Sequence, residues 1–276
     1  MFHSTHSNVL VDTQWVIEHL NDPNVRLVES GMTAESYNAG HIPGAVFWSA
    51  TDLLLPNYQM NLEPMAFEKL LARSGITNDT IVVTYGDYPA IGGWLFWLLK
   101  LFGHGDVRVL NGGRHKWLTE DRPLTKEVPT IVPTHYQAKA PNASLRALCD
   151  DVKASIDRTK RVLVDARTPQ EYSGEWFMMK PPQGTERAGH IPGALWVNYE
   201  LTLNEDGTFK SIEELQALYS AKGITADKEI IPYCAVGARS AHTWFVLKYL
   251  LGYPNVRNYD GSWNEWSRMP EIAIAR

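Results

Sequence analysis

A seven-residue segment occurs twice in this chain, and this repeat constrains the fold more than any other feature. The segment Ala-Gly-His-Ile-Pro-Gly-Ala stands at residues 39–45 and again, letter for letter, at residues 188–194. The similarity continues downstream at an offset of 148 or 149, since Tyr85 matches Tyr233 and Trp117 matches Trp266. Self-similarity over such a distance indicates a duplicated structural unit. We therefore predict two copies of one domain.

The two copies differ in length upstream of the repeated segment. Leu27 matches Leu163 at an offset of only 136, so the second copy has about a dozen extra residues between Tyr172 and Gly189. This inserted loop contains Arg187.

The length of the chain agrees with a duplication. Its 276 residues suffice for two domains that each bury their own core. The stretch between the copies has no helical or strand period and is interrupted by Pro123, Pro129, Pro133 and Pro141, which is typical of an extended linker on the surface. We expect a first domain at 1–125, a linker at 126–145 and a second domain at 146–276.

The pattern within each copy favours an α/β fold. Short β-branched runs alternate with helical stretches, as in parallel sheets flanked by crossover helices. In the second copy we expect strands at 161–164, 194–197, 229–233 and 255–259. Ser211 and Glu214 form a capping-box pattern that predicts the start of a helix running to about Ala221, and Gly223 suits the end of that helix.

A cysteine-led loop follows the apolar strand that ends at Tyr233. The loop contains Cys234, Ala235, Val236, Gly237, Ala238 and Arg239, and an apolar helical run follows at residues 240–251. Backbone N–H groups of a strand-to-helix loop converge on one point and favour negative charge there. The helix dipole and the Arg239 guanidinium act in the same direction, so the loop favours a thiolate at Cys234.

The first copy has no such nucleophile. Gly86 stands at the position that matches Cys234, and no arginine ends the loop that follows it. The first copy therefore supports the site rather than performing a second reaction. The alternative for Cys234 itself is a small buried hydrophobic residue at a strand end, which is the usual place of an isolated cysteine.

Taken together, the doubled domain, the repeated Gly-His-Ile-Pro-Gly-Ala motif, the cysteine-led loop and the Asp-Gly-Ser-Trp segment at 260–263 resemble the tandem rhodanese sulfurtransferases. The resemblance covers nearly the whole chain. Its nearest subgroup is the bacterial thiosulfate sulfurtransferases, whose loop runs Cys-x-x-Gly-x-Arg-Ser before a helix similar to residues 242–247 here. The resemblance implies two rhodanese-like domains, the second of them catalytic.

The same resemblance implies a ping-pong reaction at Cys234. The cysteine attacks the outer sulfur of thiosulfate, holds it as a persulfide and transfers it to a thiophilic acceptor such as cyanide. Residues 235–238 line the substrate site and Arg239 binds the anionic end of the donor. A second cation in the mammalian enzymes precedes an aromatic residue, where this chain has Glu171 before Tyr172, so Arg187 is the candidate here. Neither a cofactor nor a metal is required.

Other residues of chemical interest receive structural interpretations. Asp165 and Arg167 follow a strand and brace the active domain, with contact between Arg167 and substrate as the alternative. His41 and His190 precede the same turn in both copies, so we expect them to stabilise turns. Cys149 lies beside two acids that oppose thiolate formation, which makes it a bystander.

The tryptophans are expected in the core. Trp244 and Trp263 are the most notable of the ten, and Trp263 has the rim of the substrate pocket as its alternative position.

Three other functions remain open. A cysteine phosphatase of the cell-cycle type needs five residues between its cysteine and arginine, whereas four separate Cys234 from Arg239. A non-catalytic sulfur-binding module is expected to lack the cysteine. A 3-mercaptopyruvate sulfurtransferase typically has the loop Cys-Gly-Ser-Gly-Val-Thr, which offers hydroxyl groups where this chain has Ala235 and Val236.

Composition limits the partners. A net charge of -5 without a basic stripe argues against nucleic acid. No apolar run is long enough to span a membrane, and the first eight residues do not form a signal peptide, so we expect a cytoplasmic protein. Two cysteines are too few for a disulfide framework. The expected partners are a small sulfur donor and a thiophilic acceptor, and the expected state is a monomer.

Overall fold

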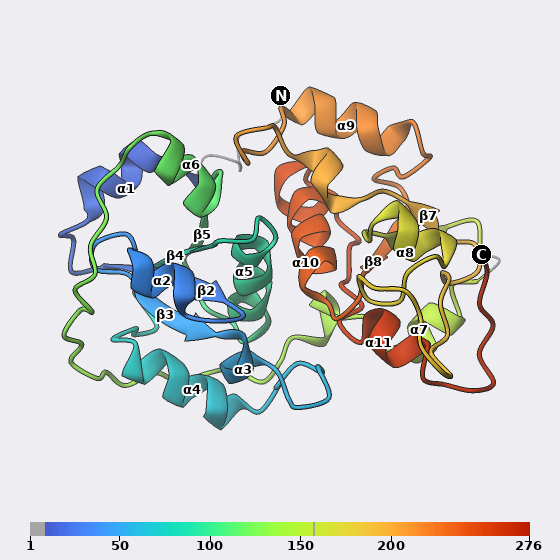
Figure 1. The fold of residues 1–276 in the computed structure, drawn as a ribbon, viewed down its shortest axis with the longest axis horizontal. Helices are drawn as coiled ribbons and strands as arrows, with labels where there is room; N and C mark the ends of the chain where they lie inside the picture. The colour runs from blue at the N-terminus through green and yellow to red at the C-terminus, as the bar shows by residue number, and fades with distance from the viewer. Residues whose placement is uncertain (1–8, 157) are drawn as a thin grey trace. The chain divides into compact units, whose positions relative to one another are not determined.

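The chain divides into two compact α/β units. The computed structural model describes residues 9–156 and 158–276. The first unit runs to Asn142 and also takes in Asn204–Phe209, and the second comprises Ala143–Leu203 and Lys210–Arg276. Each unit contains a sheet with helices around it (Figure 1), which confirms the predicted fold class.

The first unit is built on five parallel strands in the order β1-β5-β4-β2-β3. The strands are β1 (Leu10–Val11), β2 (Val25–Gly31), β3 (Val46–Ser49), β4 (Ile81–Gly86) and β5 (Val107–Leu110). The helices are α1 (Thr13–His19), α2 (Glu35–Ala39), α3 (Ala50–Leu53), α4 (Pro64–Arg73), α5 (Ile91–Leu101) and α6 (Gly113–Thr119). Strand β4 is apolar along most of its length because it lies between β5 and β2 inside the sheet.

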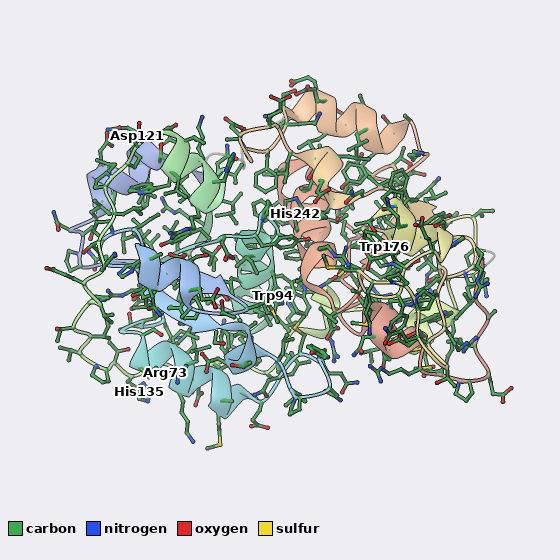
Figure 2. All side chains as sticks on the ribbon, viewed as in Figure 1. Arg73, Trp94, Asp121, His135, Trp176 and His242 are labelled. Carbon is green, nitrogen blue, oxygen red and sulfur yellow. The ribbon has the colours of Figure 1, made fainter. Side chains whose placement is uncertain are left out.

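Helix α5 follows β4 and is apolar on every side. Ten of its eleven residues are buried, including Trp94, which Figure 2 labels. A helix without a polar face belongs in the interior of a domain. The strand-loop-helix segment from β4 to α5 is therefore largely buried.

The second unit has three parallel strands in the order β7-β6-β8. They are β6 (Arg161–Asp165), β7 (Leu195–Trp196) and β8 (Glu229–Tyr233). The α-helices are α7 (Cys149–Lys153), α8 (Pro169–Ser173), α9 (Ile212–Ser220), α10 (Ala238–Phe245) and α11 (Ser262–Trp266). The other helical segments are η2 (Ala143–Leu145), η3 (Tyr199–Thr202) and the π-helical η4 (Val246–Leu250).

The prediction of a strand at 255–259 is wrong, because the structure has no strand there. Only isolated parallel bridges form there, between Ile230 and Val256 and between Arg146 and Asn258. The Arg257 and Tyr259 N–H groups donate to the Ile230 and Pro232 carbonyls, both at 3.1 Å, so the segment runs beside β8 without forming a continuous ladder. The predicted capping box before α9 is confirmed, because the Ser211 hydroxyl accepts from the Glu214 N–H at 3.2 Å.

The segment between the repeats lies against the first unit. The Thr134 and Lys139 N–H groups donate to the carbonyls of Ala72 and Phe102, both at 3.0 Å. Residues 126–142 contain no helix or strand, and they belong to the first unit.

A short segment from the second half of the chain, Asn204–Phe209, also belongs to the first unit. Within Asn204–Phe209, Asp206 pairs with Lys116 at 2.8 Å and the Phe209 N–H donates to the Asn111 side chain at 2.9 Å. Sequence reasoning had assigned this segment to the second domain.

Each unit has a hydrophobic core of its own. The core of the first unit includes Trp117, and that of the second includes Trp263 and Trp266, all fully buried. Trp244 is buried as well, so both tryptophans predicted to be core residues lie in the interior. Within the described residues, no helix has the length and apolar character that crossing a membrane requires.

Candidate functional site

Cys234 lies directly after β8, in the short turn that leads into α10. Its side chain is 1% exposed. Gly237 takes a left-handed conformation with φ of 94°, which glycine adopts without steric cost, and helix α10 begins at the next residue. The loop is therefore shorter than predicted, because Ala238 and Arg239 already belong to the first turn of the helix.

The sulfur of Cys234 receives a backbone hydrogen bond. The Gly237 N–H donates to Sγ at 3.2 Å, from the residue that precedes the helix. An N–H group and a helix N-terminus that face one sulfur both favour negative charge on it. Val236 and Ala238 are the partly exposed side chains of the loop, and both are apolar.

Ser262 holds the backbone of Cys234, a role that sequence reasoning missed. Its hydroxyl accepts from the Cys234 N–H at 3.0 Å, donates to the Tyr259 carbonyl at 2.8 Å and lies 4.0 Å from Sγ. The backbone φ of Ser262 is 52°, which is unusual outside glycine and indicates a constrained position. The Trp263 N–H donates to the Cys234 carbonyl at 3.0 Å, so the Asp-Gly-Ser-Trp segment brackets the cysteine.

Arg239 forms a buried ion pair with Glu171. Its two terminal nitrogens donate to the two carboxylate oxygens at 2.6 and 2.9 Å, and the Glu171 side chain is completely buried. Burial opposes ionisation of Glu171, but the hydrogen bonds and charge of Arg239 bring its pKa below the usual value. Sequence reasoning assigned Arg239 to the donor, whereas the structure pairs it with a carboxylate of the chain.

Glu171, the partner of Arg239, belongs to a local sequence pattern, the capping box that it forms with Thr168. The Thr168 N–H and hydroxyl both donate to Glu171, and the Glu171 N–H donates to the Thr168 hydroxyl, which forms a capping box at the start of α8. This pattern predicts a helix start, but it does not indicate that the same carboxylate reaches α10.

Arg187 bonds to the C-terminal segment. Its guanidinium donates to the Met269 and Ile272 carbonyls, both at 2.5 Å, and to that of Pro270 at 3.4 Å. The partners of the Arg187 guanidinium are therefore backbone carbonyls, whereas the sequence predicted that it contacts the sulfur donor. The role of Arg187 in donor binding stays a prediction.

Asp165 and Arg167 form a fully buried pair under the site, as expected for bracing residues. Arg167 donates to both carboxylate oxygens, at 2.9 and 2.6 Å, and to the Gly189 carbonyl at 2.7 Å. The Trp263 ring lies 4.5 Å from the guanidinium. Tyr233 donates to Asp165 at 2.6 Å, which connects the strand before Cys234 to this pair.

The first unit builds the same brace from different residues. Tyr85 donates to Glu29 at 2.8 Å, and Arg114 of α6 pairs with Glu29 at 3.0 Å. Arg114 stands where the repeat offset places Trp263, and it also donates to the Gly40 carbonyl. The duplicated domains have thus kept the interaction while the arginine moved along the chain.

Gly86 leaves no room for a side chain at the position that matches Cys234. A Cβ there would lie 2.5 Å from the Ser30 carbonyl oxygen and 2.7 Å from the Ile91 Cβ. Real Cβ atoms essentially never approach so closely. The packing of the first unit therefore opposes a nucleophile at this position.

The two histidines of the repeated motif stabilise turns, as predicted. The Nδ1–H of His41 donates to the Tyr37 carbonyl, and that of His190 to the Tyr172 carbonyl, both at 2.9 Å. Each histidine ring also stacks on the ring of that tyrosine, with centroids 3.7 Å apart for His41 and 3.8 Å apart for His190. The same arrangement in both units agrees with a structural role.

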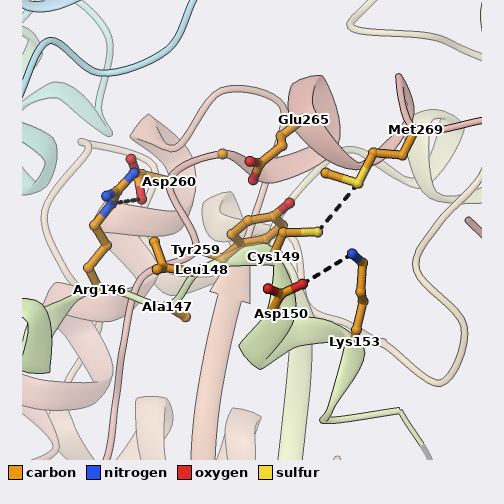
Figure 3. A pocket seen from close by; sticks show the side chains of 11 residues that line it. Arg146, Ala147, Leu148, Cys149, Asp150, Lys153, Tyr259, Asp260, Glu265 and Met269 are labelled. Carbon is orange, nitrogen blue, oxygen red and sulfur yellow. Dashed lines mark hydrogen bonds and ion pairs between the residues drawn. The ribbon is translucent and has the colours of Figure 1, made fainter.

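Cys149 differs from Cys234 in its surroundings. It begins α7 and lines a separate pocket (Figure 3), and burial raises the pKa of its thiol. A protonated thiol is a poor nucleophile, in agreement with its predicted bystander role. Within residues 9–156 and 158–276, no group of three or more histidine, cysteine, aspartate or glutamate side chains is arranged to hold a metal.

The fold and the site define a sulfurtransferase built from two α/β domains. The family model for the rhodanese-like domain matches residues 12–120 and again residues 148–269. The chain therefore belongs to the rhodanese-like domain family, as the sequence motifs indicated.

Named relatives share nearly the whole length of the chain. The sulfur carrier protein TtuD of Thermus thermophilus is 50% identical, with 98% of each chain covered. A protein of Saccharopolyspora erythraea named "Putative thiosulfate sulfurtransferase" is 43% identical over 96% of this chain and 95% of its own.

Solved structures show the same fold. The anaerobic ergothioneine biosynthesis enzyme from Chlorobium limicola, in complex with trimethyl histidine, is 27% identical with a TM-score of 0.84. The match covers 97% of this chain and 70% of that one. A variant of the enzyme EanB that carries a cysteine persulfide, in a tetrahedral intermediate state with ergothioneine, has a TM-score of 0.86 at 27% identity, with the same coverage.

Proposed function

We propose that this sulfurtransferase moves the sulfane sulfur of thiosulfate to a thiophilic acceptor through a persulfide on Cys234. The observation that carries the proposal is the Gly237 N–H directed at the buried Cys234 sulfur at 3.2 Å. A thiolate needs such a donor to persist in a buried position, and a terminal persulfide sulfur needs the same stabilisation. A solved structure of similar fold carries a cysteine persulfide, which supports the same chemistry here.

The reaction proceeds in two displacements. The Cys234 thiolate attacks the outer sulfur of thiosulfate, the sulfur–sulfur bond of the donor breaks, and sulfite leaves with the electron pair. The acceptor then attacks the terminal sulfur of the persulfide, the Cys234 Sγ–sulfur bond breaks, and the thiolate is restored. With cyanide as the acceptor the product is thiocyanate.

Within this reaction we assign Arg239 a positioning role. Its guanidinium is held by Glu171, so it ties the first turn of α10 to α8 and thereby supports the loop on which Cys234 lies. Backbone N–H groups then carry most of the anion binding within the loop. Residues 235–238 form the wall next to the reacting sulfur, and their apolar side chains favour a small sulfur donor.

A second candidate differs in its acceptor. A relative at 50% identity is named as a sulfur carrier protein, which favours transfer of the Cys234 sulfur to another protein. A 3-mercaptopyruvate donor is the third option, although Ala235 and Val236 provide no hydroxyl group for its carboxylate. We expect a cytoplasmic monomer that acts without nucleic acid, metal or cofactor.

The test is the intact mass of the protein after incubation with thiosulfate and then with cyanide. We expect the wild type to gain one sulfur atom that cyanide removes, and Cys234→Ser to gain none. Cys149→Ser is the matched control and should load like the wild type. A sulfur that loads on Cys234 but leaves more slowly with cyanide than with a protein thiol would favour the carrier function.

A negative result distinguishes a wrong sulfur donor from a wrong mechanism. If thiosulfate leaves the mass unchanged while 3-mercaptopyruvate adds one sulfur, the donor assignment is wrong. If neither donor adds sulfur to Cys234, the persulfide mechanism is wrong.

A further inference from the structure

The Gly237 carbonyl accepts hydrogen bonds from two side chains that have no role so far. The Ser240 hydroxyl donates to it at 3.1 Å and the Asn258 side-chain amide at 3.3 Å. The Ala241 N–H of α10 donates to the same oxygen at 3.1 Å. Ser240 and Asn258 are fully buried. Burying a polar side chain costs free energy unless it is hydrogen-bonded, and the contacts with this carbonyl offset that cost.

Gly237 is also the residue whose N–H donates to the Cys234 sulfur, at 3.2 Å. A glycine has more backbone freedom than any other residue, so nothing within Gly237 itself keeps its N–H in that direction. Donors on its carbonyl restrict rotation of the backbone at Gly237, where φ is 94°. The two side chains thereby act on the hydrogen bond to the sulfur.

The first unit has neither side chain at the corresponding positions. Val109 matches Asn258 at an offset of 149, and Gly92 matches Ser240 at an offset of 148. Val109 lies in β5, which pairs with β4, and Asn258 lies in the segment beside β8. A Cβ at Gly92 would lie 2.8 Å from Cγ1 of Val109, so the valine occupies the space that a serine would need.

The first unit also has no donor at the position of Gly237. Pro89 stands there at an offset of 148, and proline has no backbone N–H. The unit without a cysteine therefore has neither the N–H donor nor the two side chains that hold its carbonyl. All three features occur together in the unit that contains Cys234.

We propose that Asn258 and Ser240 are positioning residues for sulfur transfer, which hold the Gly237 carbonyl so that the Gly237 N–H stays directed at the Cys234 sulfur. Their role in the reaction rests on the proposed function. The N–H stabilises negative charge on the sulfur before it attacks the sulfur donor. A loosened Gly237 therefore lowers the fraction of Cys234 that is thiolate and slows the attack.

The test follows the ultraviolet absorbance of the Cys234 thiolate as the pH is raised. Cys149→Ser is the parent protein, because Cys234 is then its only thiol, and Cys149→Ser with Cys234→Ser is the blank. Adding Asn258→Val and Ser240→Ala removes both donors to the Gly237 carbonyl. We expect the midpoint of the absorbance change to move to higher pH by about one unit, because a hydrogen bond to an ion has a free energy of that order.

The rate at which thiosulfate adds sulfur, measured by intact mass, is the second measurement. For the same variant we expect this rate to fall by up to about tenfold, in proportion to the thiolate fraction. Ser240→Thr, which keeps a hydroxyl able to reach the preceding turn of the helix, should restore both values in place of Ser240→Ala.

Thr243→Val is the matched control. The Thr243 hydroxyl is also buried in α10 and donates to a backbone carbonyl, that of Arg239, at 3.3 Å. Its loss perturbs the same helix but leaves the Gly237 carbonyl untouched. We expect this variant to keep the absorbance midpoint of the parent.

Two results would overturn the positioning role. One is an unchanged midpoint in the folded variant that lacks both donors, and the other is an equal shift in Thr243→Val, which would show general loosening of α10. Thermal unfolding establishes that each variant is folded, and Ser240→Ala alone, which removes only a hydroxyl, is used if the combined variant does not fold. A parent that thiosulfate does not load would contradict the proposed function, while the absorbance midpoints would still test Asn258 and Ser240.

Discussion

Gly86 and Cys234 hold matching positions at the ends of β4 and β8. Their surroundings show why the first domain has a glycine where the second has a cysteine. At Cys234 the chain provides a backbone donor to the sulfur at 3.2 Å. At Gly86 it provides a carbonyl oxygen 2.5 Å from where a Cβ would lie. Packing thus favours a side chain at one position and rejects it at the other.

Gly86→Cys should therefore destabilise the protein without creating a second sulfur site. Fitting a side chain into a filled core costs about 1–3 kcal/mol. The measurement is the free energy of unfolding in urea, together with the mass after thiosulfate. Gly105→Ala is the control, because the nearest atom to its added Cβ lies 4.0 Å away. Full stability of Gly86→Cys, or a second sulfur on it, would contradict this account.

At the scale of elements, the contact between α8 and α10 determines how the loop that carries Cys234 is supported. Arg239 and Glu171 are nearly fully buried and pair at 2.6 Å. Removal of one partner leaves a charge without compensation in the interior, which is far costlier than removal of both.

We expect Arg239→Met alone to lower the free energy of unfolding by about 3–5 kcal/mol. Adding Glu171→Gln should recover much of that loss, because the amide needs no counter-charge and still accepts from Thr168. Urea unfolding of the two single variants and the double variant gives the coupling energy. If Arg239 only positions the loop, the double variant should still load sulfur from thiosulfate. A stable double variant that does not load would return Arg239 to the donor site.

Helix α10 also carries a buried histidine with a pH signature. His242, labelled in Figure 2, is fully buried, and desolvation lowers its pKa to about 3. The Thr202 hydroxyl donates to the Tyr199 carbonyl at 2.6 Å, so the His242 Nε2–H donates to Thr202 Oγ1 at 2.9 Å. A neutral imidazole is thereby built into the helix.

Stability should fall as the pH drops below about 6.5, the usual pKa of an unfolded histidine. The unfolded chain binds the proton first, so His242 should remove about 2 kcal/mol between pH 7 and pH 5, and more toward pH 3. His242→Gln, which keeps an N–H donor, should lose this dependence in urea unfolding. His135→Gln at an exposed position should keep it. An equal pH response of His242→Gln and the wild type would contradict the prediction.

At the scale of the whole molecule, the two units have separate cores. Among the described residues, the core cluster around Trp117 and the core cluster around Trp263 share no residue, and each contains residues of its own unit's sheet. Units with independent cores unfold as separate cooperative blocks unless their interface is strong.

Calorimetric unfolding should therefore depart from a single two-state transition, with a calorimetric enthalpy larger than the van 't Hoff enthalpy. Gly86→Cys should lower the temperature of only one component, because the altered core belongs to the first unit. Scanning calorimetry of both proteins is the measurement. A single transition that moves as a whole would show that the units unfold together.

The sequence by itself determined the duplicated α/β organisation and the place of Cys234 between a strand and a helix. These features are local, because the repeated motif, the apolar run of β8 and the glycine before α10 each act within a few neighbouring residues. The brace of Asp165 and Arg167 was likewise predictable, since the two residues are two positions apart.

Only the tertiary structure decided which side chains surround Cys234. Arg239 meets Glu171 across 68 positions, Arg187 meets Met269 across 82, and the Cys234 N–H meets the Ser262 hydroxyl across 28. Hydrophobic periodicity predicts which faces are buried, but not which polar groups pair once they are buried. Those pairings follow from packing, because a buried charge or donor without a partner is costly and its partner must come from the residues that the fold brings near it.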